Sequence, residues 1–329
     1  MRSTIFFLLM FFAASTLFAQ EKPYKVVRSF PVSGNDGWDY LAVYNQYLYI
    51  AHGTQVNVID KKSGQPVTVI PNTPGVHGIA FVASLHKGYI TNGRGNNVTV
   101  FDLNTNQALG QIATGENPDA ILYDAFSKQL IVCNGRGKSL SVIDPQTDKV
   151  VHTIPVNGKP ETAVSNLAGK IFVNIEDASS IAAVDIVKHT VIANWPLAPG
   201  EEPSGLAIDR STNRLFAGCD GKLVVVNAVN GSVVQTVAIG DGSDGVAFDP
   251  KARHVFSSNG DGTLTVIQQQ AADHYTVAQT LSTAPHARTL TIDETTRTIY
   301  EPVAELQPQK EKGKHAPPVT GTFRVLVIQ

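Results

Sequence analysis

The sequence has little of several residue types that mark common protein classes. Only two cysteines occur in 329 residues, Cys133 and Cys219. The repeat described below places them two repeats apart, so we expect isolated thiols and no disulfide. Charge of one sign is also lacking, because 26 Lys and Arg stand against 28 Asp and Glu. This balance gives no electrostatic footprint for nucleic acid or anionic lipid, and we expect no nucleic-acid partner.

Signatures of the common enzyme classes are absent as well. No Gly-rich phosphate loop follows a strand and opens a helix, no His-Glu-x-x-His occurs, and no Cys pair has zinc spacing. Gly-x-Ser-x-Gly, which would mark a hydrolase nucleophile elbow, does not occur either. No segment has the apolar period of an amphipathic helix, which argues against an α/β fold.

One long apolar run is present, and it lies at the N-terminus. A positively charged start, the apolar stretch Ile5 to Phe12 and small residues leading to Ala19 have the layout of a secretory signal peptide cleaved after Ala19. The run is short for a membrane span. We therefore predict a signal peptide over 1–19 and a mature chain over 20–329 that is periplasmic or secreted and has no membrane span.

A short strand-like pattern, which ends in an apolar pair and usually Asp or Asn, occurs seven times. Successive copies end 41 or 42 residues apart, except that the last ends 61 residues after the sixth. Four short strands fit in each period, which is typical of a propeller blade. The sequence thus predicts an all-β, single-domain, seven-bladed β-propeller of four-stranded blades. The seven copies are Gln55–Asp60, Asn97–Asp102, Ser139–Asp144, Ser180–Asp185, Lys222–Asn227, Thr263–Gln268 and Arg324–Gln329.

The two ends of the mature chain complement each other. The last copy ends at its third strand, whereas Lys25–Gly34 matches the fourth-strand segment Lys149–Gly158 almost position for position. We therefore predict that the N-terminal strand completes the last blade, with Val26–Phe30 antiparallel to Val325–Ile328. Such pairing closes the ring and leaves no open blade.

The second strand of one repeat carries a recognisable signature. Tyr89–Asn92 reads Tyr-Ile-Thr-Asn and resembles the Tyr-Val-Thr-Asn of the YVTN-repeat, or YncE-like, β-propellers, and Asp244–Pro250 and Ser258–Ile267 are similar to that family too. The resemblance covers essentially the whole mature chain. It implies an exported propeller and no shared catalytic motif. The repeats at Phe172–Ile175 and Phe216–Cys219 depart from the signature.

Polar residues recur at the start of the first strand of every repeat. In a propeller this strand lines the central channel, and ligands commonly bind at one mouth of it. Charged residues facing other blades would be costly to bury, so their alignment indicates a wet channel. The aligned residues are Asp39, His77, Asp119, Glu161, Ser204, Asp244 and Arg288.

We call these seven aligned residues the polar column, and two interpretations of it stay open. One is a ligand or divalent-cation site, since hard ions favour carboxylate oxygens and a His nitrogen among carboxylates suits transition metals. The other is a ring of solvated residues in which Arg288 balances part of the charge. His286, two residues before Arg288, either joins the rim of the site or is a turn histidine. The candidate metal ligands are Asp39, His77, Asp119, Glu161 and Asp244.

The loops suggest further features. Repeated Asn-Gly pairs predict left-handed turns; they are Asn92-Gly93, Asn134-Gly135 and Asn259-Gly260. Arg94 and Arg136 follow two of these pairs and either clamp an anion or are exposed turn residues. An insertion over 301–320, rich in proline and charge, joins the second and third strands of the last blade. It either caps the mouth of the channel or only decorates it.

These observations favour an exported, non-catalytic binding or scaffold propeller that acts as a monomer. It would hold a small molecule or a protein partner at one mouth of the channel or on the surface loops. The alternative is a divalent-metal-dependent lyase or lactonase-type enzyme with its site in the channel. A divalent cation is the one cofactor to which the sequence points.

Overall fold

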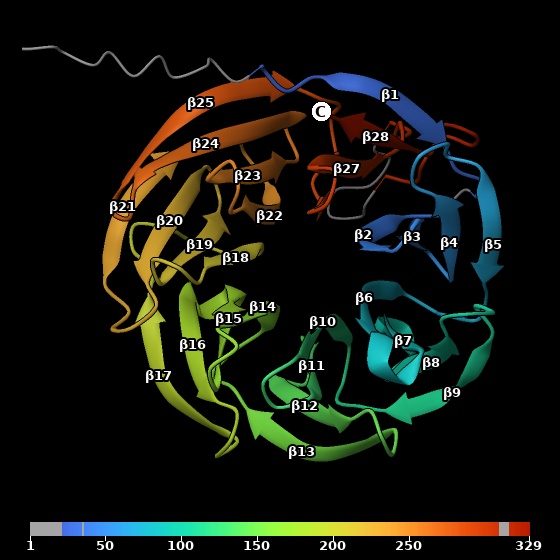
Figure 1. Ribbon diagram of the computed structural model, residues 1–329, viewed down its shortest axis with the longest axis horizontal. Helices are drawn as coiled ribbons and strands as arrows, with labels where there is room; N and C mark the ends of the chain where they lie inside the picture. The colour runs from blue at the N-terminus through green and yellow to red at the C-terminus, as the bar shows by residue number, and fades with distance from the viewer. Residues whose placement is uncertain (1–21, 35, 309–315) are drawn as a thin grey trace, which may run out of the picture.

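Seven four-stranded antiparallel sheets form a closed ring (Figure 1). The computed structural model describes residues 22–34, 36–308 and 316–329, so the predicted signal peptide lies outside the described residues. The ring confirms the predicted seven-bladed β-propeller. In each blade the first strand lies near the centre of the ring and the fourth lies at the rim.

The blades are numbered from the N-terminal side, and each of the first six consists of four strands that follow one another in the sequence. Blade 1 contains β2 (Trp38–Tyr44), β3 (Tyr47–His52), β4 (Gln55–Asp60) and β5 (Pro66–Ile70). Blade 2 contains β6 (Val76–Val82), β7 (Lys87–Asn92), β8 (Asn97–Asp102) and β9 (Ala108–Ala113). Blade 3 contains β10 (Pro118–Asp124), β11 (Gln129–Asn134), β12 (Ser139–Asp144) and β13 (Lys149–Pro155). Blade 4 contains β14 (Pro160–Ser165), β15 (Lys170–Ile175), β16 (Ser180–Asp185) and β17 (Thr190–Pro196).

The remaining blades complete the circle. Blade 5 contains β18 (Leu206–Asp209), β19 (Arg214–Cys219), β20 (Lys222–Asn227) and β21 (Val233–Ala238). Blade 6 contains β22 (Ser243–Asp249), β23 (His254–Asn259), β24 (Thr263–Ala271) and β25 (His274–Ser282). Blade 7 contains β26 (Thr291–Asp293), β27 (Thr298–Val303), β28 (Arg324–Ile328) and, from the other end of the chain, β1 (Val26–Pro31).

Helical structure is almost missing. Within the described residues it consists of three 3₁₀ turns, η1 (Ala83–Leu85), η2 (Gly93–Gly95) and η3 (Glu176–Ala178). None of the helices in this part of the chain is long and apolar enough to cross a membrane.

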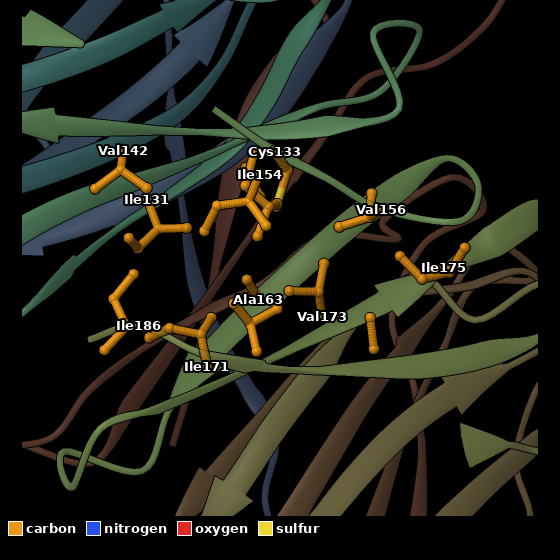
Figure 2. Packing of buried hydrophobic residues seen from close by; sticks show 14 residues of the cluster. Ile131, Cys133, Val142, Ile154, Val156, Ala163, Ile171, Val173, Ile175 and Ile186 are labelled. Atoms are coloured by element: carbon orange, nitrogen blue, oxygen red, sulfur yellow. The ribbon is translucent and has the colours of Figure 1, made fainter. Parts of the chain in front are cut away.

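The core lies between the blades. The second and third strands are buried on both faces because each blade is packed between two others. The fourth strands are mostly exposed, and in β13 only Ile154 is buried. Figure 2 shows the contact of blades 3 and 4, where Ile131 and Val142 pack with Ile171 and Val173. Cys133 lies in the same cluster, and it and Cys219 are buried free thiols, as predicted.

The N-terminal strand closes the ring as the sequence predicts. β1 pairs antiparallel with β28, with Val26 opposite Ile328 and Phe30 opposite Val325. Phe30 is buried in a cluster that combines blades 7 and 1 and includes Tyr300 and Leu48. The closing strand therefore contributes both backbone hydrogen bonds and a buried aromatic side chain.

Two loop predictions need correction. The Asn-Gly pairs do not form left-handed turns: Gly93, Gly135 and Gly260 have ordinary φ angles, and the left-handed residues are Asn96, Lys138 and Gly262. That prediction was wrong because each turn is longer than two residues, so the left-handed residue closes the turn instead of opening it.

The insertion also begins later than predicted. β27 continues to Val303, so residues 301–303 belong to a buried strand. Leu306 and Pro318 then form an antiparallel bridge that draws the two described ends of the loop together. The segment between them, 309–315, lies outside the described residues.

A carboxyl group is buried in the last blade without a partner. Glu301 on β27 has no exposed surface, and neither of its oxygens bonds to any described residue. The hydroxyl of Thr283 lies close enough to oppose the rise in the pKa of Glu301, although it forms no hydrogen bond of regular geometry. Burial raises the pKa of Glu301 well above its ordinary value of 4.5, because the charged form would lose its water.

This burial predicts a pH-dependent cost to stability. A raised pKa in the folded state means that stability is highest below the unfolded pKa and falls as pH rises above it. Glu301→Gln removes this titration, so the variant should gain stability relative to wild type with rising pH, by on the order of 1–3 kcal/mol at pH 8. Urea unfolding at pH 4 to 8 measures the difference, with the exposed Glu305→Gln as control. A Glu301→Gln difference that is constant over this range would contradict the prediction.

Candidate functional site

The regular pairing of first and second strands is interrupted near one end of the first strand in five blades. The register shifts across 38–41, 76–79, 118–121, 160–163 and 243–245. Such a bulge redirects a side chain out of the normal alternation. Each interval contains one member of the predicted polar column. They are Asp39, His77, Asp119, Glu161 and Asp244.

Hydroxyl groups hold these bulges against the neighbouring blades. The Thr91 hydroxyl accepts the backbone N–H of Gly78 at 2.7 Å and donates to the backbone carbonyl of Asp119 at 2.5 Å. Thr289 donates to the carbonyl of Asp39 at 2.9 Å. Both link one blade to the next, so hydrogen bonds fix the backbone at Asp119 and Asp39.

One cavity of about 660 Å³ lies at this end of the channel, which we call the mouth. All seven residues of the column line it, including Ser204 and Arg288, which precede β18 and β26. Seven carboxylates surround the cavity against three Lys or Arg and one His. The carboxylates are Asp39, Asp119, Glu161, Glu176, Glu202, Asp220 and Asp244, and the basic residues are His77, Arg136, Lys159 and Arg288.

His77, Asp39 and Asp119 form the tightest group in the mouth. His77 Nδ1 bonds to Asp39 Oδ2 and lies 3.9 Å from Asp119 Oδ1. One ligand atom of each of the three residues lies within 4.8 Å of the other two. Gly93 packs against the opposite edge of the His77 ring. A Cβ on Gly93 would lie only 2.7 Å from His77 Nε2, so a larger residue would collide with the ring.

The other two candidate ligands bond to basic side chains. Glu161 Oε1 lies 2.6 Å from Lys159 Nζ, which also pairs with Glu176. Asp244 Oδ2 lies 2.9 Å from Arg288, and its Oδ1 accepts the Ser204 hydroxyl. The five candidates therefore share one cavity but split into three local groups.

Burial and crowding shift the titration of the cavity. Burial lowers the pKa of His77, but the hydrogen bond with Asp39 and the negative charge of Asp119 outweigh burial and raise it to about 9. Burial raises the pKa of Asp119, and Asp39 adds to the rise. Burial also raises the pKa of Glu161, with repulsion from Asp119 adding to it. Carboxylates that resist losing their protons favour a cation close to them.

His286 does not line the main cavity. It faces a second cavity of about 400 Å³ with Trp38, Leu306 and Pro318, and Arg288 lines both cavities. The described ends of the insertion therefore lie beside the mouth, although not over the carboxylate column. Of the two turn arginines, Arg136 lines the main cavity, whereas the Arg94 side chain packs against Gly75.

Sequence reasoning missed four charged residues of the mouth, Lys159, Glu176, Glu202 and Asp220. Lys159 lies two residues before Glu161, where the basic charge was a visible signal. Glu176 follows Phe172–Ile175, the repeat that departs from the signature, so this departure marked a polar residue of the mouth. Their pairing with Glu161 depends on the loops that carry them, and no repeat pattern specifies it.

Comparison with known proteins supports the fold. A family model named PQQ_2 and described as outer membrane protein assembly factor BamB matches residues 94–302, more than half of the chain. A chain of Kuenenia stuttgartiensis hydrazine synthase is 14% identical, with a TM-score of 0.73, over 82% of this chain and 94% of that one.

Two further solved structures, the RRP9 WD40 repeats and U3-55K, each have a TM-score of 0.77 at 11% identity. They cover 92% and 91% of this chain and 97% of their own length. Identities this low bear on the fold alone. No curated protein matches the chain.

The hydroxyl of Thr91 provides a test of how the mouth is built. Thr91→Val keeps the shape of the side chain but leaves the Gly78 N–H and the Asp119 carbonyl without this partner, so we expect a loss of about 1–3 kcal/mol in the free energy of unfolding. Thr91→Ser keeps the hydroxyl and should lose less. Urea unfolding of both variants measures the effect. A valine variant as stable as the serine variant would show that the bulges do not depend on this hydroxyl.

Proposed function

The chain belongs to the PQQ_2 family, described as outer membrane protein assembly factor BamB, and from this membership we propose that it is a non-catalytic binding propeller. It holds a ligand or a protein partner at the mouth of its central channel. The observation that carries the proposal is the cavity of about 660 Å³ onto which one residue from every blade converges. A concave site with a few convergent polar groups is the usual form of a ligand site.

The charge of the mouth points to the kind of ligand. Carboxylates outnumber basic groups around the cavity, although the chain as a whole is almost neutral. A cleft lined by one sign of charge concentrates ligands of the opposite sign. The ligand or partner therefore presents a cationic group to the mouth, and Arg288 and Arg136 lie where they can receive an anionic group of the same ligand.

The proposal includes export and the finer family resemblance. The charged start, the apolar stretch and Ala19 support a periplasmic or secreted protein. The Tyr-Ile-Thr-Asn signature supports a place among the YVTN-repeat propellers. N-terminal sequencing of the protein from a periplasmic fraction should begin at Gln20. A protein that keeps Met1 and stays in the cytoplasm would contradict export.

A metal-dependent lyase or lactonase-type enzyme is the second candidate. The cluster of Asp39, His77 and Asp119 favours it, because a bound divalent ion polarises a carbonyl and activates water. Hydrolysis of lactones that depends on added Zn²⁺ and disappears in His77→Gln would favour the enzyme. Absence of turnover over a broad lactone panel would favour the binding protein.

A thermal-shift screen tests the binding proposal. Chelator-treated protein is screened against small cationic, zwitterionic and anionic molecules, and we expect stabilisation by molecules that carry a cationic group. Glu202→Lys at the mouth should weaken binding at least about tenfold, because it replaces an attractive charge with a repulsive one. Glu294→Lys, in the β26–β27 turn at the opposite end of the channel, is the matched control. Ligand binding that is weakened by Glu294→Lys and unchanged by Glu202→Lys would show that the binding site lies away from the mouth.

A further inference from the structure

We propose that Asp39, His77 and Asp119 together bind one divalent transition-metal ion, such as Zn²⁺ or Mn²⁺, on the wall of the mouth formed by blades 1 to 3. The inference rests on the proposed function, because it names one ligand of the same cavity. It also reduces the number of candidate metal ligands from the five that the sequence predicts to three.

The three ligand atoms come from equivalent positions on consecutive blades. Asp39, His77 and Asp119 lie in the bulges of β2, β6 and β10. Their ligand atoms lie within 4.8 Å of one another. Around an ion with bonds of about 2.1 Å, ligand atoms are roughly 3–3.5 Å apart. Small side-chain rotations therefore bring all three to one ion, with no change of backbone.

The partners of the other carboxylates distinguish this group. Glu161 pairs with Lys159, which also bonds to Glu176, and Asp244 is held by Arg288 and Ser204. By contrast, within the described part of the chain the Asp39 carboxylate bonds only to His77, and the Asp119 carboxylate accepts no hydrogen bond. Both are largely buried, with side chains 17% and 13% exposed. Two such carboxylates side by side repel each other, and a divalent ion would offset more negative charge than the one imidazolium of His77.

The supporting backbone is already fixed. The carbonyls of Asp39 and Asp119 accept the hydroxyls of Thr289 and Thr91, which hold the two bulges in place. Gly93 leaves room for the His77 ring with Nδ1 turned toward the carboxylates. Ligands held by such supporting contacts bind an ion with little loss of freedom.

The donor set selects the class of metal. One imidazole nitrogen and two carboxylate oxygens suit Zn²⁺ or Mn²⁺, whereas Ca²⁺ and Mg²⁺ prefer oxygen ligands alone. Three protein ligands leave at least one coordination position open toward the cavity. A ligand of the mouth can reach this position.

Calorimetric titration of the full mature protein after chelator treatment tests the inference. We expect one Zn²⁺ per chain, bound more tightly than Ca²⁺, and affinity at least about tenfold weaker in Asp39→Asn, His77→Gln and Asp119→Asn. The matched controls Glu161→Gln and Asp244→Asn lie in the same cavity and should stay within about threefold of wild type. Absence of stoichiometric binding, or equal losses in all five variants, would overturn the site.

A second measurement does not depend on how the variants fold. In the wild-type protein, sub-stoichiometric Mn²⁺ should broaden the NMR signals of the His77 ring before those of the other histidines. Broadening that begins at another histidine would also overturn the site. The ligand screen uses chelator-treated protein, so a failure of metal binding and a failure of the binding function give separate results.

Discussion

Seven first strands share one axis, and the space between their backbones limits everything built around the channel. At the mouth the chain of one blade almost touches the next: a Cβ on Gly78 would lie 2.9 Å from both the Asp119 carbonyl oxygen and the Ile121 nitrogen. Gly205 meets β22 at a similar distance. Regular pairing cannot continue through such crowding, and the bulges in β2, β6, β10, β14 and β22 occur at this point. The polar column is thus a product of how closely the blades approach.

The same constraint explains the signature residues of the second strand. Thr91 holds the bulge, Asn92 donates to Thr99 inside its own blade, and Tyr89 bonds to Asp148 of the next blade. The bonds of Thr91 and Tyr89 cross from blade 2 to blade 3, whereas the bond of Asn92 joins two strands of blade 2. Two residues of the signature therefore link neighbouring blades, and Thr91 also positions the mouth.

The fold could be predicted from the sequence because the information repeats. Seven copies of one strand pattern specify seven blades, and the match of Lys25–Gly34 to Lys149–Gly158 specifies the closure. The convergence of the column follows from the same symmetry. What breaks the symmetry could not be predicted, including the pairing of Lys159 with Glu161 and the place of His286 in a second cavity. These features depend on loops whose paths differ from blade to blade. The repeat also does not predict a buried carboxyl at Glu301 in β27, a position that is Ile90 in blade 2.

The pairing of β1 with β28 also determines the order in which the molecule can be completed. These strands lie at opposite ends of the described chain, so the contact between them closes the longest loop the protein contains and comes at the greatest entropic cost. During synthesis β1 appears first, yet its partner appears last, and blades 1 to 6 can assemble before the last blade has all its strands. In this interval β1 is an unpaired strand. Its sequence suits that state, since Phe30 is its only buried residue in the finished ring. The two chain ends therefore dock late, after their neighbouring blades can already have formed.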